Sequence, residues 1–347
     1  MALEAVGSNP ITHPMKNALL STNKGAFLNI YALSNNSGFT NNNVNPKDAL
    51  PQKRYQMNTY LKSFDFPGEE RENDHFLHFH MTCYDNFYPF RTLHKDFTHI
   101  EFEPITILYG GNGSGKSTVL NVIAEKLGIT RSVKINTTDF FEDYVYLCDC
   151  KTSKEMPIAK IITSDDVFKN LFLTREKNEL IDRKRREIFE LHDRYNKPDA
   201  FQKTLSGKSL IKNADLLQDF FDARATRSKY ARSRVEQNII GKSNGETALD
   251  FFVNEIKDEG VYLLDEPENS LSAAFQLELT AFLSDSARFF GAQLVIATHS
   301  PFLLSIPNAK IYNLDTSPVS ETYDFTTLEN MRIYHDFFKK ISDRFEK

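Results

Sequence analysis

Apolar residues fall into short runs and turn-spaced repeats that predict alternating strands and helices through most of the chain. Continuous apolar runs at Ile105–Tyr109, Val261–Leu264 and Gln293–Ala297 are typical of buried strands in a parallel sheet. The first run is followed by a glycine-rich loop and by a helical pattern over Ser117–Leu127. A strand, a loop and a helix in this order predict an α/β domain with a mostly parallel sheet.

A highly charged helical region interrupts this pattern in the middle of the chain. Asp165–Tyr195 is dense in Arg, Lys and Glu and carries apolar residues at turn spacing. It predicts one helix about 45 Å long at ~1.5 Å per residue. A second helical piece is expected over Ala214–Asn238, so we expect a helical insertion over about 165–241. The α/β pattern then resumes with a helix over Ala273–Ser284, a last strand near Lys310–Leu314 and a C-terminal helix.

The chain before the glycine-rich loop is less regular. Residues 1–67 hold asparagine clusters such as Asn41–Asn43 and little apolar periodicity, so we expect a polar, loosely structured N-terminal extension with room for one short element. The main domain is then expected to span residues 68–347. Within it, Phe76–Thr82 resembles a strand and Phe97–Tyr109 contains two more, which predicts an N-terminal antiparallel strand region.

Composition adds few constraints. Hydrophobic residues make up 40% and charged residues 26% of the chain, as in ordinary globular proteins, and the net charge of −5 indicates no global positive field. No signal-peptide pattern and no apolar stretch near the roughly 18 residues of a membrane span is present. The cysteines Cys83, Cys148 and Cys150 suit a reducing compartment, and the last two are expected to be packing residues rather than zinc ligands. We therefore expect a cytoplasmic protein without membrane insertion.

A phosphate-binding loop is the clearest chemical signal in the sequence. The segment Gly110–Ser117 matches the pattern of a glycine, four residues and then Gly-Lys-Ser. Only a glycine-rich turn lets backbone N–H groups wrap phosphates at a helix N-terminus. Lys116 is expected to bridge the β- and γ-phosphates, and Ser117 to ligate Mg²⁺. The predicted nucleotide-binding residues are Gly110, Gly111, Asn112, Gly113, Ser114, Gly115, Lys116, Ser117 and Thr118.

A pair of acids ends the second apolar strand. Asp265 and Glu266 follow Val261–Leu264 and precede Pro267, at the carboxyl end of a strand, where open α/β sheets place their ligands. Asp265 is expected to hold Mg²⁺ together with Ser117. Glu266 is placed where a carboxylate can polarise an attacking water, and it is the predicted catalytic residue.

These motifs together resemble those of a known family. Asp265–Ser272 and the later Ala297–Pro301 look like the Walker B, D-loop and switch-histidine series of ABC-type ATPases, which are P-loop NTPases. The version resembles the RecF, SMC and OLD-like branch and the stand-alone bacterial ATPases related to it. The resemblance extends over about Phe97–Leu314. It implies that Glu266, Lys116 and His299 are catalytic, with His299 as the γ-phosphate switch.

The resemblance also implies a signature motif that reaches the γ-phosphate of a partner subunit. Ser243-Asn244-Gly245-Glu246 occupies the expected place before Asp265 and is a variant of the family's Leu-Ser-Gly-Gly-Gln. Taken alone, this segment is more typical of a helix cap than of a ligand. In this context Ser243, Gly245 and Glu246 are expected to bind nucleotide across a dimer.

The expected fold is therefore an α/β ABC-type P-loop ATPase head, with N-terminal antiparallel strands and a helical insertion that carries the signature motif. The expected cofactors are ATP and Mg²⁺, and the expected assembly is a homodimer that closes around two ATP molecules. The resemblance favours a role in DNA transactions or anti-phage defence, with a separate effector protein because little sequence follows His299. The alternative is the nucleotide-binding subunit of an ABC transporter.

Three positions stay open at the level of sequence. Family members usually carry a sensor glutamine, and Ser164–Asp166 after the strand-like Ile158–Thr163 occupies the equivalent place. Tyr88 or Phe90 could contact adenine, although core packing is the more common role of such residues. The basic segment Arg224–Arg234 could contact nucleic acid, a partner subunit or only solvent.

Two further patterns are set aside. Asn196-Lys197-Pro198-Asp199 matches a guanine-reading motif but follows a charged helix instead of an apolar strand. His75, His78 and His80 could suggest a metal site, but no further ligand stands at useful spacing.

Overall fold

The computed structural model describes residues 58–77, 84–93, 96–197, 218–219, 221–239 and 243–345. The predictions on the asparagine clusters, on Cys83, on His78 and His80 and on Pro198 and Asp199 lie outside these residues. Residues 55–347 form one compact unit, and all elements described below belong to it.

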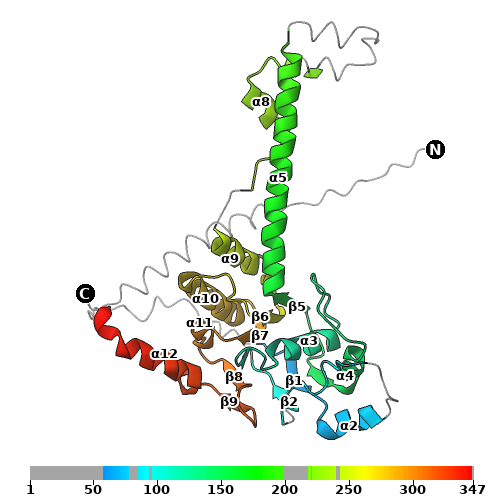
Figure 1. Ribbon diagram of the computed structural model, residues 1–347, viewed down its shortest axis with the longest axis vertical. Helices are drawn as coiled ribbons and strands as arrows, with labels where there is room; N and C mark the ends of the chain where they lie inside the picture. Colours follow the sequence, from blue (N-terminus) through cyan, green and yellow to red (C-terminus); the bar gives the residue numbers. More distant parts are fainter. Residues whose placement is uncertain are drawn as a thin grey trace, which may run out of the picture. The chain divides into compact units, whose positions relative to one another are not determined.

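The main sheet carries the strands that the apolar runs predict. Its strand order is β5-β6-β7-β3-β8-β9; the first five strands run parallel, and β9 pairs antiparallel with β8. β7 lies between β3 and β6, so the two strands that end in the predicted site residues are not neighbours (Figure 1). The strands are β3 (Ile105–Tyr109), β5 (Ile158–Thr163), β6 (Gly260–Asp265), β7 (Ala292–Thr298), β8 (Lys310–Asn313) and β9 (Ser320–Thr322).

Side chains alternate between the two faces of this sheet and build two cores. Leu108, Leu263 and Val295 belong to the core that α3 (Lys116–Lys126) and α4 (Phe141–Leu147) cover. Their neighbours in sequence, such as Ile107 and Leu264, belong to the core on the opposite face. That face is covered by α9 (Asn244–Glu255), α10 (Ala273–Phe289) and the short α11 (Pro301–Leu304). Because both faces are covered, the central strands β3, β6 and β7 are buried along almost their whole length.

A second, antiparallel sheet has the order β2-β1-β4, with β1 at Leu61–Asp65, β2 at His99–Glu101 and β4 at Asp149–Thr152. The expected combination of a parallel sheet with N-terminal antiparallel strands is therefore confirmed. β1 lies within residues 58–67, which the sequence assigned to the polar extension. Leu61 and Phe64 of β1 are fully buried, so this strand is part of the core.

One buried side chain joins the two sheets. Oε1 of Gln293 in β7 accepts hydrogen bonds from the backbone N–H groups of Tyr60 and Leu61, both at 2.8 Å. Its Nε2 donates to the carbonyls of Leu61 at 2.8 Å and Glu103 at 3.3 Å. All four polar contacts satisfy backbone groups that burial would otherwise leave unpaired, so Gln293 fixes β1 against the start of β7.

The strand predicted over Phe76–Thr82 is wrong at its first two residues. Phe76 and Leu77 end α2 (Glu69–Leu77), a helix that buries none of its residues and carries three acids in its first turn. Acidic side chains in the first turn stabilise the positive end of the helix dipole, and this local effect outweighs the strand tendency of the aromatic residue. β2 and β3 are the two strands expected over Phe97–Tyr109.

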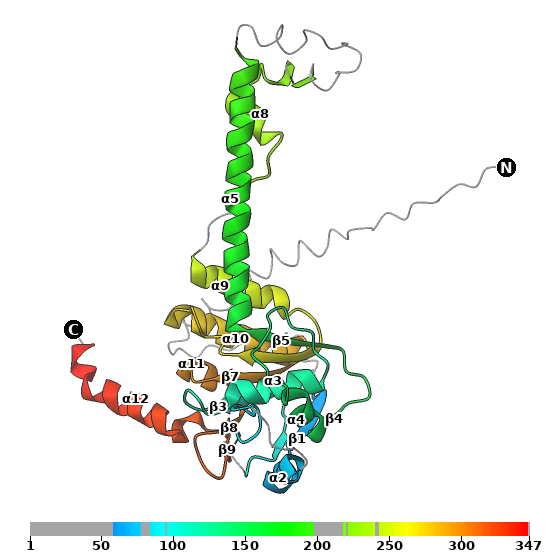
Figure 2. The same cartoon turned by 45° about the vertical axis from the view of Figure 1, so that its right-hand side comes forward.

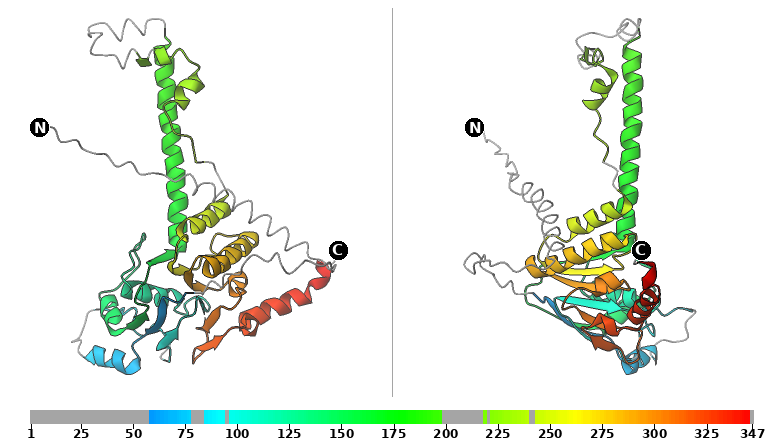
Figure 3. Two further views of the ribbon diagram at one scale, coloured as in Figure 1. Left: turned by 180° about the vertical axis from the view of Figure 1, so that it is seen from behind. Right: turned by 90° about the vertical axis from the view of Figure 1, so that its left-hand side faces the viewer.

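The predicted long helix is α5 (Ser164–Tyr195), 32 residues long. Thr163 and Asp166 form a capping box at its start, with the Thr163 N–H donating to Asp166 Oδ2 at 2.8 Å. α5 runs away from the sheet, and α8 (Arg227–Arg232) packs beside its far half (Figures 1, 2 and 3). Asn196, the first residue of the segment that matches the guanine-reading motif, is the C-cap of α5. The segment therefore follows a helix and not a strand. α12 (Glu329–Lys340) lies beyond the β8–β9 edge.

Within the described part of the chain, no helix combines the length and apolar character that crossing a bilayer would need. The same residues contain no cluster of His, Cys, Asp and Glu side chains fit to hold a metal through three such ligands. Cys148 is buried in the core and its Sγ contacts the Tyr144 carbonyl oxygen at 3.3 Å, which matches the packing role expected for it.

Candidate nucleotide-binding site

The glycine-rich loop lies between the carboxyl end of β3 and the start of α3. Gly113 and Gly115 have φ angles of 84° and 93°, in the left-handed region that favours glycine. Gly115 is also the N-cap of α3, and a Cβ there would lie 2.9 Å from a side-chain carbon of Leu93. The backbone path of the loop therefore depends on glycine, and it ends at the positive pole of a buried helix.

Lys116 is folded over this loop. Its Nζ donates hydrogen bonds to the carbonyls of Gly110 at 2.8 Å and Gly111 at 2.9 Å, and it lies 3.9 Å from Glu266 Oε1. The side chain is only 4% exposed. A buried ammonium held by backbone carbonyls can exchange those acceptors for phosphate oxygens without crossing solvent.

Ser117, in the first turn of α3, contacts Asp265, the last residue of β6. The Ser117 hydroxyl donates to Asp265 Oδ1 at 3.0 Å. The pKa of Asp265 is raised to about 6, chiefly by burial and also by the charge of Glu266, although the hydrogen bond from Ser117 and the charges of Lys116 and Arg131 act to lower it. A hydroxyl and a carboxylate oxygen in contact are the hard donors that Mg²⁺ prefers, so the donor set fits this cation.

Glu266 is held in an unusual backbone conformation next to Asp265. Its φ is 46°, a left-handed value that is rare outside glycine, and its N–H donates to the Ala297 carbonyl at 2.9 Å. Asn269 Nδ2 donates to Glu266 Oε2 at 3.0 Å, and His299 Nδ1 lies 3.9 Å from Oε1. Strain of this kind persists where the surroundings over-determine a residue, and it collects at functional sites.

The AAA_23 family, described as an AAA domain, matches residues 84–259, which is just over half of the chain. The protein belongs to this family. The P-loop lies within the matched residues, so the protein is a member of a P-loop ATPase family. No curated protein shows significant sequence similarity to the chain.

The chain is also similar to solved structures, of which three share 13–17% of its residues. The Smc head domain of Pyrococcus furiosus with an extended coiled coil, bound to the C-terminal domain of ScpA, is 13% identical over 83% of this chain and 100% of its own, with a TM-score of 0.38. An Smc head bound to the ScpA winged-helix domain is 14% identical over 78% and 100%, with a TM-score of 0.37. An inward-facing metal-chelate type ABC transporter is 17% identical over 65% and 74%, with a TM-score of 0.31.

The predicted signature residues make local structural contacts. Ser243 is the N-cap of α9: its hydroxyl accepts from the Glu246 N–H at 3.2 Å and donates to Glu246 Oε2 at 3.0 Å. A Cβ on Gly245 would lie 2.6 Å from the Phe275 ring in α10. These contacts lie within the first turn of α9 and between α9 and α10. The structure thus gives Ser243, Gly245 and Glu246 roles in helix capping and packing, and binding across a dimer stays a prediction.

A contact that the sequence did not predict supports the outer side of the P-loop. The Gly111 N–H donates to both carboxylate oxygens of Asp315, at 2.8 Å and 3.0 Å. Asp315 follows β8, the parallel neighbour of β3. The available signal was its position just beyond the carboxyl end of a strand, the same signal that singles out Asp265.

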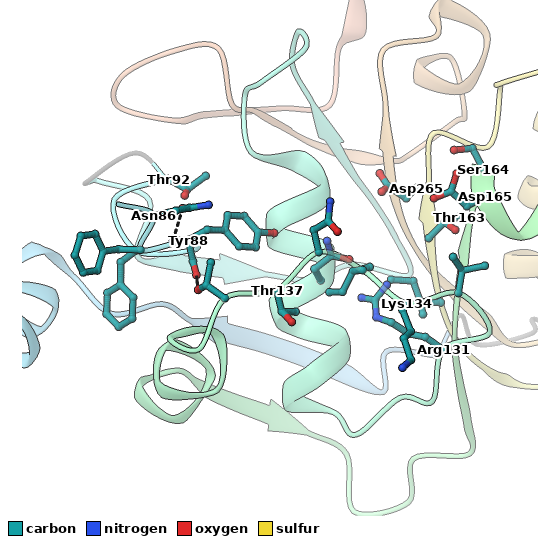
Figure 4. A pocket seen from close by; sticks show the side chains of 18 of the residues that line it. Asn86, Tyr88, Thr92, Arg131, Lys134, Thr137, Thr163, Ser164, Asp165 and Asp265 are labelled. Carbon is teal, nitrogen blue, oxygen red and sulfur yellow. Dashed lines mark hydrogen bonds between the residues drawn. The ribbon is translucent and has the colours of Figure 1, made fainter. Parts of the chain in front are cut away.

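A cavity of about 760 Å³ lies beside Asp265 (Figure 4). It extends from Asp265 past Asn121 and Arg131 to Tyr88 and Phe90, and it therefore includes both candidate adenine contacts. The open sensor position, Ser164–Asp166, lines the same cavity. Tyr88 stacks on Phe141 with ring centroids 5.9 Å apart, whereas Phe90 is 4% exposed and packs in the core.

Arg131 is the second residue that the sequence did not single out. Its Nε and Nη2 are buried, and within the described residues neither has a hydrogen-bond partner. Burial lowers the pKa of Arg131, while the charges of Glu125, Asp265 and Asp166 raise it. A buried cation with free donors at the wall of a cavity favours an anionic ligand there.

The basic segment Arg224–Arg234 is partly engaged in structure. Arg234 pairs with Asp219 at 2.7 Å and Asp222 at 2.8 Å, and its guanidinium carbon lies 4.0 Å from the Tyr230 ring centroid. Arg227 pairs with Asp193 at 3.2 Å and covers the Phe189 ring. The Arg227 contacts attach α8 to α5, and the Arg234 contacts attach α8 to the segment with Asp219 and Asp222. The exposed cations of the segment include Arg224, Lys229 and Arg232.

Proposed function

We propose that this AAA-family protein is an ATP-binding and ATP-hydrolysing switch or motor subunit of the ABC type, in the RecF, SMC and OLD-like branch. The observation that carries the proposal is the meeting of the Ser117–Asp265 pair with Glu266 and His299 at the mouth of the P-loop. This arrangement supplies a cation site, a carboxylate for an attacking water and a phosphate-binding loop within one cluster.

In the proposed reaction, P-loop amides and Lys116 bind the phosphates of ATP. Ser117 and Asp265 would hold Mg²⁺, which would neutralise charge on the phosphates. Glu266 orients the attacking water in line with the γ-phosphate, and Asn269 fixes the second carboxylate oxygen of Glu266. His299, with its ring 46% exposed beside Glu266, is placed to donate to the transferred phosphoryl group.

The cavity next to Asp265 supports a place for the nucleoside. Its aromatic lining at Tyr88 and its polar lining at Asn86, Thr92 and Asn121 offer a stacking face and hydrogen-bond groups. The free donors of Arg131 would meet phosphate or ribose oxygens there. This proposal assigns Tyr88, rather than the core residue Phe90, to the base.

We further propose a head-to-tail homodimer in which Ser243, Gly245 and Glu246 of one subunit face the γ-phosphate of the other. The exposed start of α9 supports it, since N–H groups at a helix start suit a phosphate. Closure on ATP would then drive a separate effector protein of the cytoplasm, in DNA transactions or anti-phage defence.

ATP turnover by the full chain tests the proposal. We expect Mg²⁺-dependent phosphate release that Glu266→Gln abolishes while ATP binding persists, and an ATP-dependent dimer in size-exclusion chromatography with that variant. Glu278→Gln, an exposed acid on α10, is the matched control. Wild-type protein that binds no ATP, or turnover that survives Glu266→Gln, would reject the proposed mechanism.

Nucleic acid as the trigger is tested in the same assay. Turnover that rises with duplex DNA, single-stranded DNA or RNA, weakens with salt and falls in an Arg224, Lys229 and Arg232 triple alanine variant would place the segment on a phosphate backbone. Turnover indifferent to all three nucleic acids would reject that role and leave a protein partner as the gate.

A further inference from the structure

A second glutamate contacts His299, which lies beside the proposed catalytic residue Glu266. Glu268, two residues after Glu266, is only 5% exposed. Its Oε1 accepts a hydrogen bond from the Thr298 hydroxyl at 2.6 Å and another from the His299 backbone N–H at 3.1 Å. Glu268, in the connection between β6 and α10, therefore binds the residues at the carboxyl end of β7.

The same oxygen contacts the imidazole of His299. Nδ1 of His299 lies 3.4 Å from Glu268 Oε1 and 3.9 Å from Glu266 Oε1. Both carboxylates thus face one edge of the ring. Nε2, at the opposite edge, has no hydrogen-bond partner among the described residues. A ring held by Nδ1 leaves Nε2 for another ligand.

A network around Glu268 fixes the backbone that carries His299. The Thr298 hydroxyl, which donates to Glu268, accepts from the Ser300 N–H at 3.0 Å. The Ser300 hydroxyl donates to Gln276 Oε1 of α10 at 2.7 Å. The turn at 298–300 is therefore held from two sides, and Glu268 is the charged member of this network.

The second carboxylate oxygen of Glu268 makes the arrangement costly. Oε2 is buried and has no hydrogen-bond partner among the described residues. A half-satisfied buried carboxylate is a poor way to stabilise a loop, because a neutral amide could hold the same two donors without the desolvation cost of a charge. The charge of Glu268 therefore needs a reason other than capping the end of β7.

We propose that Glu268 is a positioning residue for His299. It holds the imidazole by Nδ1, so that Nε2 faces the γ-phosphate of ATP bound to the P-loop. When both ring nitrogens carry hydrogen, Nδ1 donates to Glu268 and Nε2 donates to the transferred phosphoryl group. The inference rests on the proposed function, because it needs a phosphate in front of His299.

The substitution Glu268→Gln separates this role from a structural one. The amide oxygen of glutamine can still accept from the Thr298 hydroxyl and the His299 N–H, so the turn keeps its two hydrogen bonds. What is lost is the carboxylate opposite Nδ1. Glu268→Ala removes the carboxylate and also the two hydrogen bonds to the turn. Glu278→Gln is the control, because it changes an acid that makes none of these contacts.

The test uses the full chain. For Glu268→Gln we expect a melting temperature close to wild type, ATP binding within about 3-fold, and a kcat about 10- to 100-fold lower with little change in KM. His299→Ala should lower kcat similarly, and the double variant should be no slower than His299→Ala, because both act through one ring. Wild-type kcat in Glu268→Gln, or losses that multiply in the double variant, would overturn the proposal.

A second readout does not depend on turnover. In nitrogen-15 NMR spectra of histidine-labelled, nucleotide-free protein, with His299→Ala for assignment, we expect Nδ1 of His299 to carry hydrogen in the wild type and its signal to shift in Glu268→Gln, where a neutral amide replaces the carboxylate. An Nδ1 signal unchanged by the substitution would overturn the contact. If the wild type shows no ATP turnover, the proposed function fails, and this spectrum alone decides the Glu268–His299 relationship.

Discussion

The hydroxyl of Ser117 donates a hydrogen bond to Oδ1 of Asp265 at 3.0 Å, across 148 residues of sequence. β3, which leads into the P-loop, and β6, which ends at Asp265, are separated by β7. The residues meet because parallel strands deliver their carboxyl ends to one edge of the sheet, where the P-loop also lies. Two oxygen donors are thus paired before any cation binds.

Asp265→Asn is expected to abolish Mg²⁺-dependent hydrolysis while stabilising the nucleotide-free protein. Burial raises the pKa of Asp265 from an ordinary 3.8 to about 6, so the folded state binds this proton more tightly than the unfolded chain does. The resulting stabilisation is complete below pH 3.8 and is lost as the pH rises to about 6. Above that pH the ionised group costs up to about 3 kcal/mol at ~1.4 kcal/mol per pKa unit.

Thermal unfolding of wild type and Asp265→Asn between pH 4 and pH 8 checks this expectation. The variant should melt higher at pH 7.5, and the difference should shrink towards pH 4. Glu278→Gln, an exposed acid of α10 outside the site, controls for a general effect of removing a charge. A variant that melts lower than wild type at pH 7.5 would contradict the prediction.

Lys116→Met should weaken ATP binding by about 10- to 100-fold, because it removes charge-assisted hydrogen bonds worth ~1.5–3 kcal/mol. Binding of a fluorescent ATP analogue measures the effect. Lys126→Met is the matched control, since Lys126 stands at the other end of α3 and donates to the Val145 carbonyl at 3.2 Å. Equal losses in both variants would point to a damaged helix rather than a lost phosphate contact.

Gly245→Ala should destabilise the fold by about 1–3 kcal/mol, because its Cβ would lie 2.6 Å from the Phe275 ring. Denaturant unfolding measures the change. Combination with Phe275→Ala should recover part of the loss by making room for the methyl group. Gly68→Ala, where the added Cβ meets only Thr98 at an ordinary 3.6 Å, is the control, and a Gly245→Ala protein as stable as this control would refute the packing argument.

Arg234→Ala should loosen α8 from the segment that carries Asp219 and Asp222. Arg234 is 23% exposed, pairs with both acids and covers the Tyr230 ring of α8, so its removal breaks both ion pairs and uncovers the aromatic face. Hydrogen exchange of the α8 peptides should rise at least about 10-fold, as expected for a loss of ~1.4 kcal/mol in local stability. Arg232→Ala, at an exposed position of the same helix, should leave exchange unchanged.

Much of the fold could be predicted from local patterns. The strand over Ile105–Tyr109 and the strand and helix starts near Val261 and Ala273 depend on apolar runs, caps and glycines that stand next to each other in the chain. β1 escaped prediction because it is one short strand after a long polar stretch. Its burial depends on Gln293, more than 200 residues later.

The P-loop, the acids at Asp265 and Glu266, and the histidine at 299 are determined by the sequence itself, because each motif is contiguous and sits at a strand end that apolar periodicity reveals. Only the tertiary structure decided that β7 separates β3 from β6, that Asp315 holds Gly111, that Arg131 lines the cavity with free donors and that Glu268 faces His299. These contacts follow from strand order and from the crossovers between strands. Local periodicity specifies each strand and its faces, but the choice of neighbouring strand depends on the free energy of packing the whole sheet.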